Sequence, residues 1–521
     1  MAGHNSNRDY DDDDDDDLTA VGEETPLLLA DEVPEEPKFL YRQNVTILCF
    51  AAIFLAELGI AIMTPAWNAV MEDLICQRYV PRAADGQLLA DDPRCKDPRI
   101  QGELAMLRGW QASFEGIPAI LCAIPFGIMA DKVGRKPVML LAWTGLLLNL
   151  LWYEVVFAFF PLWVVWLGAI PLFIGGFPSV GPAMIFTCLA DVTPQPERAS
   201  VFFRVSAVFL VAELISGPIG GALLLVHPWL PLLVGMLINL LSFFTLWVLP
   251  ETAHLIKKVD EQEAEDAADE EEVDRPVEGT WHHMMMTAKR DLLETSKFIL
   301  GNRSIVILMI PMVFYAVGKY VQELLLQYAT KRYHWTWSKA AFLLTIRSSS
   351  NLILLVALLP GISWLMLEKF HYSAIRKDVV LARFSGITLA IGSLMIAFAW
   401  TPGVLSVALV VFSLGGGFNS LVRSLLNAMV EVHHIAILNV LLGIAEFGGL
   451  MVSSPMLFAA LRAGLNAGGA LIGLPFLIAA VMFTIGTAMV FLFRAPEERV
   501  TVEDREAEIG REEEEEAEEE P

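Results

Sequence analysis

Long apolar stretches alternate with short polar segments along the chain, and many of them are long enough to be membrane helices. An α-helix needs roughly 20 apolar residues to cross a bilayer. Twelve stretches reach about this length, at residues 44–70, 106–130, 137–159, 162–190, 199–226, 230–249, 304–328, 338–366, 380–400, 402–426, 435–461 and 469–493. A polar insert divides them six and six. The pattern predicts an all-α membrane protein with twelve transmembrane helices in two six-helix bundles, 44–250 and 304–494.

The composition agrees with this pattern. Of the 521 residues, 55% are hydrophobic and only 19% are charged, against about 25% in a soluble domain. The net charge of −25 comes mainly from acidic runs such as 11–17 and 512–520. These runs cannot bury a core, so we expect disordered tails at 1–43 and 495–521 and an acidic cytosolic loop at 251–303. A calcium-binding role for residues 11–17 is the less favoured alternative.

The basic residues of the short loops set the expected orientation. With the N-terminus inside, the cytosolic loops collect Lys132, Arg135, Lys136, Arg376 and Lys377, as the positive-inside rule requires. We therefore expect both termini in the cytosol. The expected location is the plasma membrane. The segment Glu23–Leu28 fits an acidic dileucine signal for a sorting adaptor, which makes the vacuolar membrane the alternative.

A short repeat supports the division into two halves. The fourth stretch contains Gly175-Gly176-Phe177-Pro178-Ser179, and the tenth contains Gly416-Gly417-Phe418-Asn419-Ser420. The same pentapeptide pattern in the fourth helix of each half is typical of a duplicated transporter. Close helix packing alone also favours pairs of glycines.

The loop after the second stretch carries the most specific motif, Gly127-Ile-Met-Ala-Asp131-Lys132-Val-Gly134-Arg135-Lys136. We expect Gly127 to lie where its helix passes a neighbour closely and Gly134 to make the turn. Asp131, at the membrane border, would face the positive end of a helix or an arginine. Arg135 and Lys136 would anchor the loop to carboxylates and lipid headgroups.

This loop resembles the G-x-x-x-D-R/K-x-G-R-R/K motif of the major facilitator superfamily, and the resemblance covers residues 40–495. It implies the major facilitator fold, with two pseudo-symmetric bundles around a central cavity. It also implies that Asp131 and Arg135 form a charge network that holds the outward-open state, with Asp191 and Arg198 as partners. The matching loop of the second half, 367–383, keeps charges but not the motif.

A narrower resemblance comes from the first outer loop and the helix that follows it. The run from Ile75-Cys76-Gln-Arg-Tyr79 through Cys95-Lys96 to Leu107-Arg108-Gly109-Trp110 resembles a group of fungal members. Many of these are efflux carriers for secondary metabolites. The organisation is more distantly similar to the proton-coupled folate and tetracycline-efflux branches.

The fifth stretch resembles a motif of the family's antiporters, G-x-x-x-G-P-x-x-G-G. The matching residues are Gly217, Pro218, Gly220 and Gly221, with one residue fewer before the last pair and Glu213 in place of the first glycine. We expect a proline kink with a face of small residues. The partial match favours antiport only mildly.

Four glutamates fall near the middle of apolar stretches: Glu57, Glu115, Glu213 and Glu446. An ionised carboxylate there costs about 2.5–3.5 kcal/mol or more, so each must face a cavity, find a partner or bind a proton. A glutamate whose protonation follows its exposure provides the chemistry of a proton-coupled carrier. The alternative for each is a neutral side chain that hydrogen-bonds between helices.

Cationic side chains also lie at depth. Lys319 and Glu323 are four residues apart on the seventh stretch, a spacing at which they would neutralise each other. Arg423 lies on the tenth stretch with Asn419. Arg347 would either close a salt bridge to one of the glutamates or, if unpaired, bind an anionic substrate.

Other chemistries have little support. Cys76 and Cys95 share an outer loop, where a disulfide is expected to stabilise the loop. The chain has no Walker loop, His-Glu-x-x-His, Gly-x-Ser-x-Gly or metal-ligand spacing, so we expect neither an enzyme nor a metal or other cofactor, and no ATP-driven pump.

The resulting hypothesis is a secondary transporter, monomeric in the lipid bilayer, that uses a proton gradient to export an amphipathic organic small molecule. The first alternative is a proton-coupled importer of an organic anion, in which Arg347 binds the substrate. The second is a transporter-like sensor that signals through its tails. No nucleic-acid partner is expected.

Overall fold

The computed structural model describes residues 39–80, 92–252, 301–430 and 432–493. Within these ranges the regular elements are all helices. The first half contains α1 (Phe39–Tyr79), α2 (Pro98–Val133), α3 (Arg135–Phe159), α4 (Phe177–Val192), α5 (Gln195–Val226) and α6 (Trp229–Val248). The second half contains α9 (Arg303–Lys319), α10 (Leu325–Tyr333), α11 (Trp337–Ile353), α12 (Leu359–Trp364), α13 (Ala374–Ala397), α14 (Pro402–Ser413), α15 (Phe418–Asn427), α16 (Val432–Ala467) and α17 (Leu474–Leu492).

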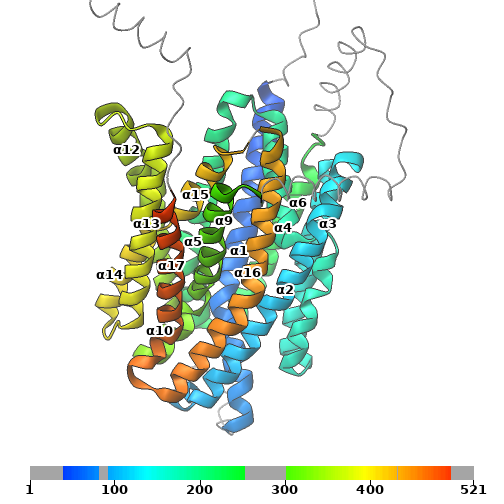
Figure 1. Ribbon diagram of the computed structural model, residues 1–521. Helices are drawn as coiled ribbons and strands as arrows, with labels where there is room; N and C mark the ends of the chain where they lie inside the picture. Colours follow the sequence, from blue (N-terminus) through cyan, green and yellow to red (C-terminus); the bar gives the residue numbers. More distant parts are fainter. Residues whose placement is uncertain (1–38, 81–91, 253–300, 431, 494–521) are drawn as a thin grey trace, which may run out of the picture.

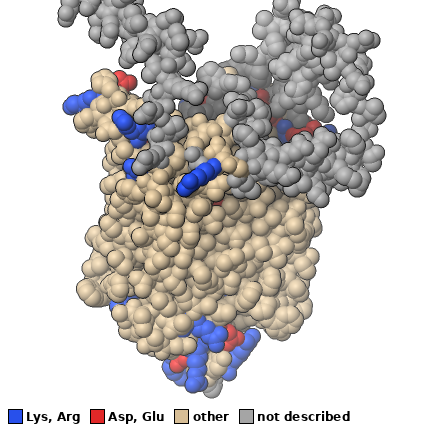
Figure 2. All heavy atoms as spheres, in the orientation of Figure 1, with Lys and Arg blue, Asp and Glu red and all other residues tan. Residues whose placement is uncertain are grey.

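These elements make 12 helical segments that are long and apolar enough to cross a membrane, which confirms the predicted fold class. The long helices run side by side (Figure 1). Charged side chains gather at the two ends of the molecule and leave an apolar band between them (Figure 2). The tails, the signal at 23–28 and most of the insert 251–303 lie outside the described residues.

Two names distinguish the ends of the molecule. The motif end carries the turn at Gly134 between α2 and α3, and the disulfide end carries Cys76 and Cys95. Helix α1 has 41 residues and is therefore about 60 Å long. It continues well past residue 70, where its apolar run stops. Likewise, α2 starts at Pro98, before its apolar run begins at residue 106. The polar residues that interrupt the apolar pattern remain helical at the disulfide end.

The fourth segment of each half is broken, not continuous as its apolar run predicts. In the first half, two 3₁₀ turns (η3, Leu162–Ala169, and η4, Pro171–Phe173) precede α4, and Gly175 and Gly176 take positive φ values of 101° and 65°. In the second half, α14 ends at Ser413 and α15 begins at Phe418. The repeated Gly-Gly-Phe-x-Ser pattern therefore marks an equivalent break in both halves.

Two further segments change helical type along their length. A 3₁₀ turn (η5, Tyr320–Leu324) separates α9 from α10. Two π-helical turns (η6, Leu354–Leu358, and η7, Leu365–Lys369) flank α12. Each change rotates the side chains that follow it relative to an ideal α-helix.

The two halves pack together along two seams near the disulfide end. On α2, methyl groups built on Gly102, Gly109 and Gly116 would lie 2.8–2.9 Å from side chains of α16. These glycines are seven residues apart, which keeps them on one face of the helix. In the second seam, Gly217 and Gly221 of α5 lie against the backbone of α11. In a membrane, apolar side chains gain little by leaving the lipid for another helix. Small residues instead stabilise the contact by letting the helices approach closely.

The seam between α2 and α16 ends before the motif end. A methyl group on Gly127 of α2, or on Gly443 of α16, would meet no described atom within 4 Å. The π-helical turns and α12, which continue α11 toward this end, are also largely exposed. The halves are therefore closed against each other at the disulfide end and diverge toward the motif end.

Replacing Gly175 by alanine should destabilise the protein. The side chain would be strained by about 1–3 kcal/mol at this positive φ, and its Cβ would lie 2.4 Å from the backbone nitrogen of Ala142. We expect the midpoint of thermal unfolding, followed by intrinsic fluorescence, to fall by at least about 2 °C. Gly403→Ala is the matched control, because a methyl group there meets nothing within 4 Å. Equal midpoints for the two variants would contradict this account of the break.

Candidate functional site

A cavity of about 490 Å³ lies between the two halves, within the range of roughly 300–1,000 Å³ typical of small-molecule sites. Its walls come from α1, α2, α3, η4, α4, α5, η5, α10, α11 and α16. Five of the predicted residues line it: Glu57, Glu115, Glu213, Glu323 and Arg347. Aliphatic and aromatic side chains provide most of the remaining wall.

Arg347 of α11 forms an ion pair with Glu213 of α5. From the sequence, Arg347 is expected either to form a salt bridge with a glutamate or to bind an anionic substrate. The structure contains the salt bridge. The pair joins the second half to the first at mid-depth, next to the seam where Thr345 donates a hydrogen bond to the carbonyl oxygen of Leu214. Each charge compensates the other where an unpaired charge would be costly.

A second ion pair crosses the cavity at Glu323. Its carboxylate lies 4.0 Å from the guanidinium of Arg108 on α2, so the expectation that it pairs with Lys319 is wrong. Lys319 ends α9 and is exposed, whereas Glu323 follows in the 3₁₀ turn η5. Because residues advance by a larger angle in a 3₁₀ helix, the four-residue spacing no longer places the two side chains on one face.

Glu115 is held by neutral hydrogen-bond donors of the first half. The hydroxyl of Tyr153 and the amide of Gln111 both donate to its carboxylate, Gln111 over 2.9 Å. Gln111 in turn accepts a hydrogen bond from Arg108, and Asn149 donates to the oxygen of Tyr153 over 2.9 Å. The carboxylate is thus fixed in position without a direct cationic partner among these side chains.

Glu57 lines the cavity from α1 and differs from the other cavity acids. Among the side chains that the structure describes, it forms neither a hydrogen bond nor an ion pair. Ile60, Ala61, Thr64 and Trp67 follow it along the same wall, with the helical spacing that puts them on one face of α1. Glu57 is the member of this stripe nearest the motif end.

Asn419 and Glu446 lie outside the cavity, in the second half. Glu446 of α16 is 3.7 Å from Arg423 of α15, so the pair is contained within one half.

Glu154 of α3 is another acid in an apolar stretch, which the sequence analysis does not single out. One of its carboxylate oxygens is buried without a hydrogen-bond partner in the described structure. Within the described residues, no cluster of three His, Cys, Asp or Glu side chains is placed to hold a metal ion.

The motif end contains the charge network that the family resemblance implies. Arg135 forms ion pairs with Asp131, four residues before it, and with Asp191 at the end of α4, at 3.7 Å. Gly134 makes the turn with φ at 118°. All these groups belong to the first half, and the Asp131 side chain is 67% exposed. Among the residues that the structure describes, the ion pairs of Arg135 therefore stay within the first half.

Two residues that the sequence reading overlooked complete this network. The carboxylate of Glu251 accepts hydrogen bonds from the backbone N–H groups of Arg135, at 2.8 Å, and Lys136, at 3.1 Å. It thereby caps the N-terminus of α3, where the helix dipole favours a negative charge. Thr252 donates to Asp191 over 2.8 Å. Both lie just after α6, in a segment that its composition assigns to the loop.

Other residues of the motif behave differently from expectation. Gly127 has no close neighbour among the described atoms, so the expected close helix contact is wrong for this conformation: α2 has already left α16 at that depth. Lys132 is exposed and Lys136 is half-buried. Arg198 lies in α5, but its side chain is outside the described residues.

The predicted small-residue face of α5 serves two contacts. Gly217 and Gly221 face α11 across the seam, whereas Gly220 lies against the backbone of α1, where an added methyl group would lie 2.9 Å from the carbonyl oxygen of Ile62. Pro218 lies inside the helix. The glycines therefore position α5 against both halves at the depth of the cavity.

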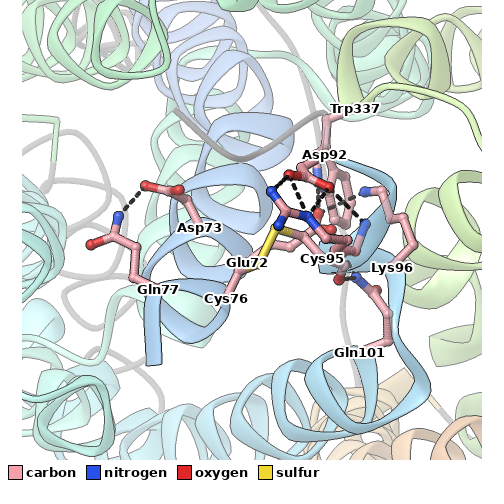
Figure 3. The surroundings of a disulfide bond; sticks show 10 residues. Glu72, Asp73, Cys76, Gln77, Asp92, Cys95, Lys96, Gln101 and Trp337 are labelled. Atoms are coloured by element: carbon pink, nitrogen blue, oxygen red, sulfur yellow. Dashed lines mark hydrogen bonds and ion pairs between the residues drawn. A yellow bond between two sulfur atoms is a disulfide. The ribbon is translucent and has the colours of Figure 1, made fainter. Parts of the chain in front are cut away.

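A disulfide joins Cys76 of α1 to Cys95, and a buried polar cluster surrounds it (Figure 3). The ammonium group of Lys96 lies 2.7 Å from the carboxylate of Glu72, which is completely buried. Gln101 donates to the same carboxylate over 2.9 Å. By tying Cys95 to α1, the disulfide holds Lys96 over Glu72.

The first-half partners Glu72, Lys96 and Gln101 also contact the second half. The indole N–H of Trp337 donates to Glu72, and Lys96 lies 5.0 Å from the centre of the Trp337 ring. Gln327 donates to the carbonyl oxygen of Gln101 over 2.8 Å, and Lys331 donates to that of Lys96. Opening the disulfide end would have to break all of these bonds. We call this set of residues the disulfide-end cluster.

One charged pair beside the cluster lies at the surface. The side chain of Arg94 donates to Asp92 and lowers the pKa of that carboxyl group below its usual value. Asp92 also accepts a hydrogen bond from the backbone N–H of Arg94, over 2.9 Å. The pair starts the short turn that carries Cys95 toward α1.

Comparison with known proteins gives the family. A sequence model described as Major Facilitator Superfamily matches residues 104–454, more than half of the chain. The efflux pump ustT of Aspergillus flavus is 32% identical over 441 residues, covering 82% of this chain and 84% of its own. The MFS efflux pump atnC of Emericella nidulans is 29% identical over 447 residues, with coverage of 84% and 85%. These similarities confirm the resemblance predicted from loop 127–136 and segment 75–110.

Solved structures agree on the fold. A crystal structure of a D-xylose–proton symporter superimposes with a TM-score of 0.60 at 14% sequence identity, covering 88% of this chain and 99% of the other. At this identity the likeness is one of architecture.

Trp337→Phe should favour opening of the disulfide end. The variant keeps the ring but removes the hydrogen bond to the Glu72 carboxylate, a bond worth about 1.5–3 kcal/mol. Once the free cysteines are replaced by serine, we expect a cysteine introduced at Ser113, buried in the α2–α16 seam, to react at least fivefold faster with a charged thiol reagent.

Trp400→Phe is the matched control for this measurement, because Trp400 lies at the same end but is 74% exposed. It should leave the reaction rate of the introduced cysteine unchanged. If Trp337→Phe also leaves that rate unchanged, the bond to Glu72 does not hold the disulfide end closed.

Proposed function

Because the chain belongs to the major facilitator superfamily, we propose that it is a proton-driven exporter of an amphipathic organic small molecule. Membership of this family makes the protein a multi-pass membrane transporter rather than an enzyme. The proposal adds the direction of transport, the coupling to protons and the general nature of the cargo.

The single observation that carries the proposal is the unequal balance of charge in the central cavity. Four acids line it, and its two arginines are each in an ion pair with one of them. Glu57 and Glu115 form no ion pair with a described side chain; Arg347 and Arg108 act on them only through space. Carboxylates in such a place are expected to bind and release protons as the cavity changes its access.

The relatives support the direction. Both ustT and atnC are named efflux pumps, and the chain matches more than four fifths of each. The apolar and aromatic wall beside the acids suits a cargo with a large apolar body. The anion-import alternative loses its main support because Arg347 is already paired with Glu213.

We assign the motif end to the cytosol, with both termini on that side, from the basic residues of its loops. The conformation would then face the cytosol. Cargo would enter from the motif end and displace the protons of the cavity acids. The halves would rock to open the disulfide end, and the cargo would leave as protons return. The proton gradient supplies the energy, and no cofactor is needed. The protein would act as a monomer in the plasma membrane, or alternatively in the vacuolar membrane.

The direction of proton coupling can be measured in proteoliposomes with the membrane potential clamped. Rhodamine 6G, an amphipathic dye with a permanent charge, should accumulate in vesicles with an acid interior if the dye exchanges for protons. Symport predicts accumulation in vesicles with an alkaline interior. We expect Glu57→Gln and Glu115→Gln to reduce this pH-driven accumulation at least tenfold.

Glu154→Gln is the matched control, since Glu154 also lies in an apolar helix but outside the cavity. It should keep most of the pH-driven accumulation. Dye flux that ignores the pH gradient in the unsubstituted protein would refute proton coupling. Flux that persists unchanged in both cavity variants would refute the assignment to these acids.

A further inference from the structure

We propose that the cavity selects cationic cargo, and that Glu57 binds the positive group. The inference rests on the proposed transport function and names the chemical class of the cargo: a protonated amine or a quaternary centre attached to an apolar, preferably aromatic, body.

The first step is the charge available to a ligand. Arg347 is in contact with Glu213, and Arg108 lies 4.0 Å from Glu323 and also donates to Gln111. Both cations of the cavity wall are therefore occupied by protein groups. An anionic cargo would have to break one of these pairs and leave a carboxylate unpaired in a site of low dielectric constant, which is costly.

The second step separates the two remaining acids. Glu115 accepts hydrogen bonds from Tyr153 and Gln111, which fix its carboxylate and satisfy part of its hydrogen-bonding capacity. Glu57 accepts none from the described side chains. Of the two, Glu57 is the acid whose oxygens remain available to a ligand inside the cavity.

The third step is the shape of the wall around Glu57. Ile60, Thr64 and Trp67 continue along the same face of α1, over about 15 Å of helix from residue 57 to residue 67. Tyr320 and Phe177 contribute aromatic groups from the other elements. An aromatic face attracts a cation and also packs well against an apolar body. A ligand with its charge at Glu57 would extend its apolar body toward Trp67.

The position of Glu57 also suits capture of cargo. It is the residue of this stripe nearest the motif end, where the halves diverge. A cation that enters between the halves therefore meets Glu57 before the rest of this stripe, and the charges of Arg347 and Glu323 act through space on the same carboxylate. A proton and the cationic group would compete for this carboxylate, so the cargo and the driving ion share one site.

Two probes of nearly equal size and shape but opposite charge test the sign. Tetraphenylphosphonium, tetraphenylborate and neutral triphenylphosphine oxide are titrated separately onto the full chain in lipid nanodiscs, and binding is followed by tryptophan fluorescence. At pH 8 we expect tetraphenylphosphonium to bind at least tenfold more tightly than either other probe. Tetraphenylborate that binds as tightly, or no binding of the phosphonium, would overturn the proposal.

Variants test the residue. Glu57→Gln should weaken tetraphenylphosphonium binding at least tenfold and change triphenylphosphine oxide binding less than twofold. In the unsubstituted protein, proton competition should lower phosphonium affinity at acid pH, and Glu57→Gln should abolish this pH dependence. Glu154→Gln, outside the cavity, should leave all three binding curves unchanged. Phosphonium affinity that survives Glu57→Gln would overturn the assignment to Glu57. The comparison of probe charges in the unsubstituted protein needs no variant and stays decisive if Glu57→Gln misfolds.

This experiment is independent of the flux measurement. Flux driven by the pH gradient together with binding that ignores probe charge would leave the proposed function intact and refute cation selection. Selective phosphonium binding together with flux that ignores the pH gradient would leave the cation site intact and refute proton coupling.

Discussion

The compensation of charge inside an apolar body governs this structure. An ionised side chain in a medium of low dielectric constant needs a partner, and here several partners lie on opposite halves of the molecule. Arg347 pairs with Glu213, Arg108 pairs with Glu323, and Trp337 donates to the buried Glu72. The two ion pairs join the halves at the cavity, and the Trp337–Glu72 bond joins them at the disulfide end. The same contacts occupy the cations of the cavity, and Glu57 is left without an ion pair among the described side chains.

The two ends of the molecule are organised differently. At the disulfide end, the disulfide preassembles Lys96 over Glu72 in the first half, and the second half docks onto this arrangement. At the motif end, Arg135 and Asp191 interact within the first half, and Asp131 is largely exposed. Asp131 is therefore available to the second half if the motif end closes. Beside the glycine seams and short polar bonds, one buried apolar cluster contains residues of both bundles.

The sequence predicts local features well and long-range pairs poorly. Twelve apolar runs define the fold. Asp131 and Arg135 are only four residues apart, so their ion pair is a local contact that the motif predicts. By contrast, the Glu72–Trp337 bond joins positions far apart in the chain, and Glu72 itself lies where the apolar run has already ended. The pairing of Glu323 was mispredicted because the helix changes type after Lys319. No periodicity in the sequence signals such a change.

If the halves rock against each other, closing one end opens the other, and double electron–electron resonance tests this coupling directly. After replacement of the free cysteines by serine, spin labels at Tyr79 and Leu471 report on the disulfide end, and labels at Val133 and Phe370 on the motif end; all four residues are exposed. Across pH 5.5 to 8, with and without tetraphenylphosphonium, the account predicts that longer Tyr79–Leu471 distances accompany shorter Val133–Phe370 distances. Distances that lengthen together at both ends, or a disulfide end that never opens, would contradict it.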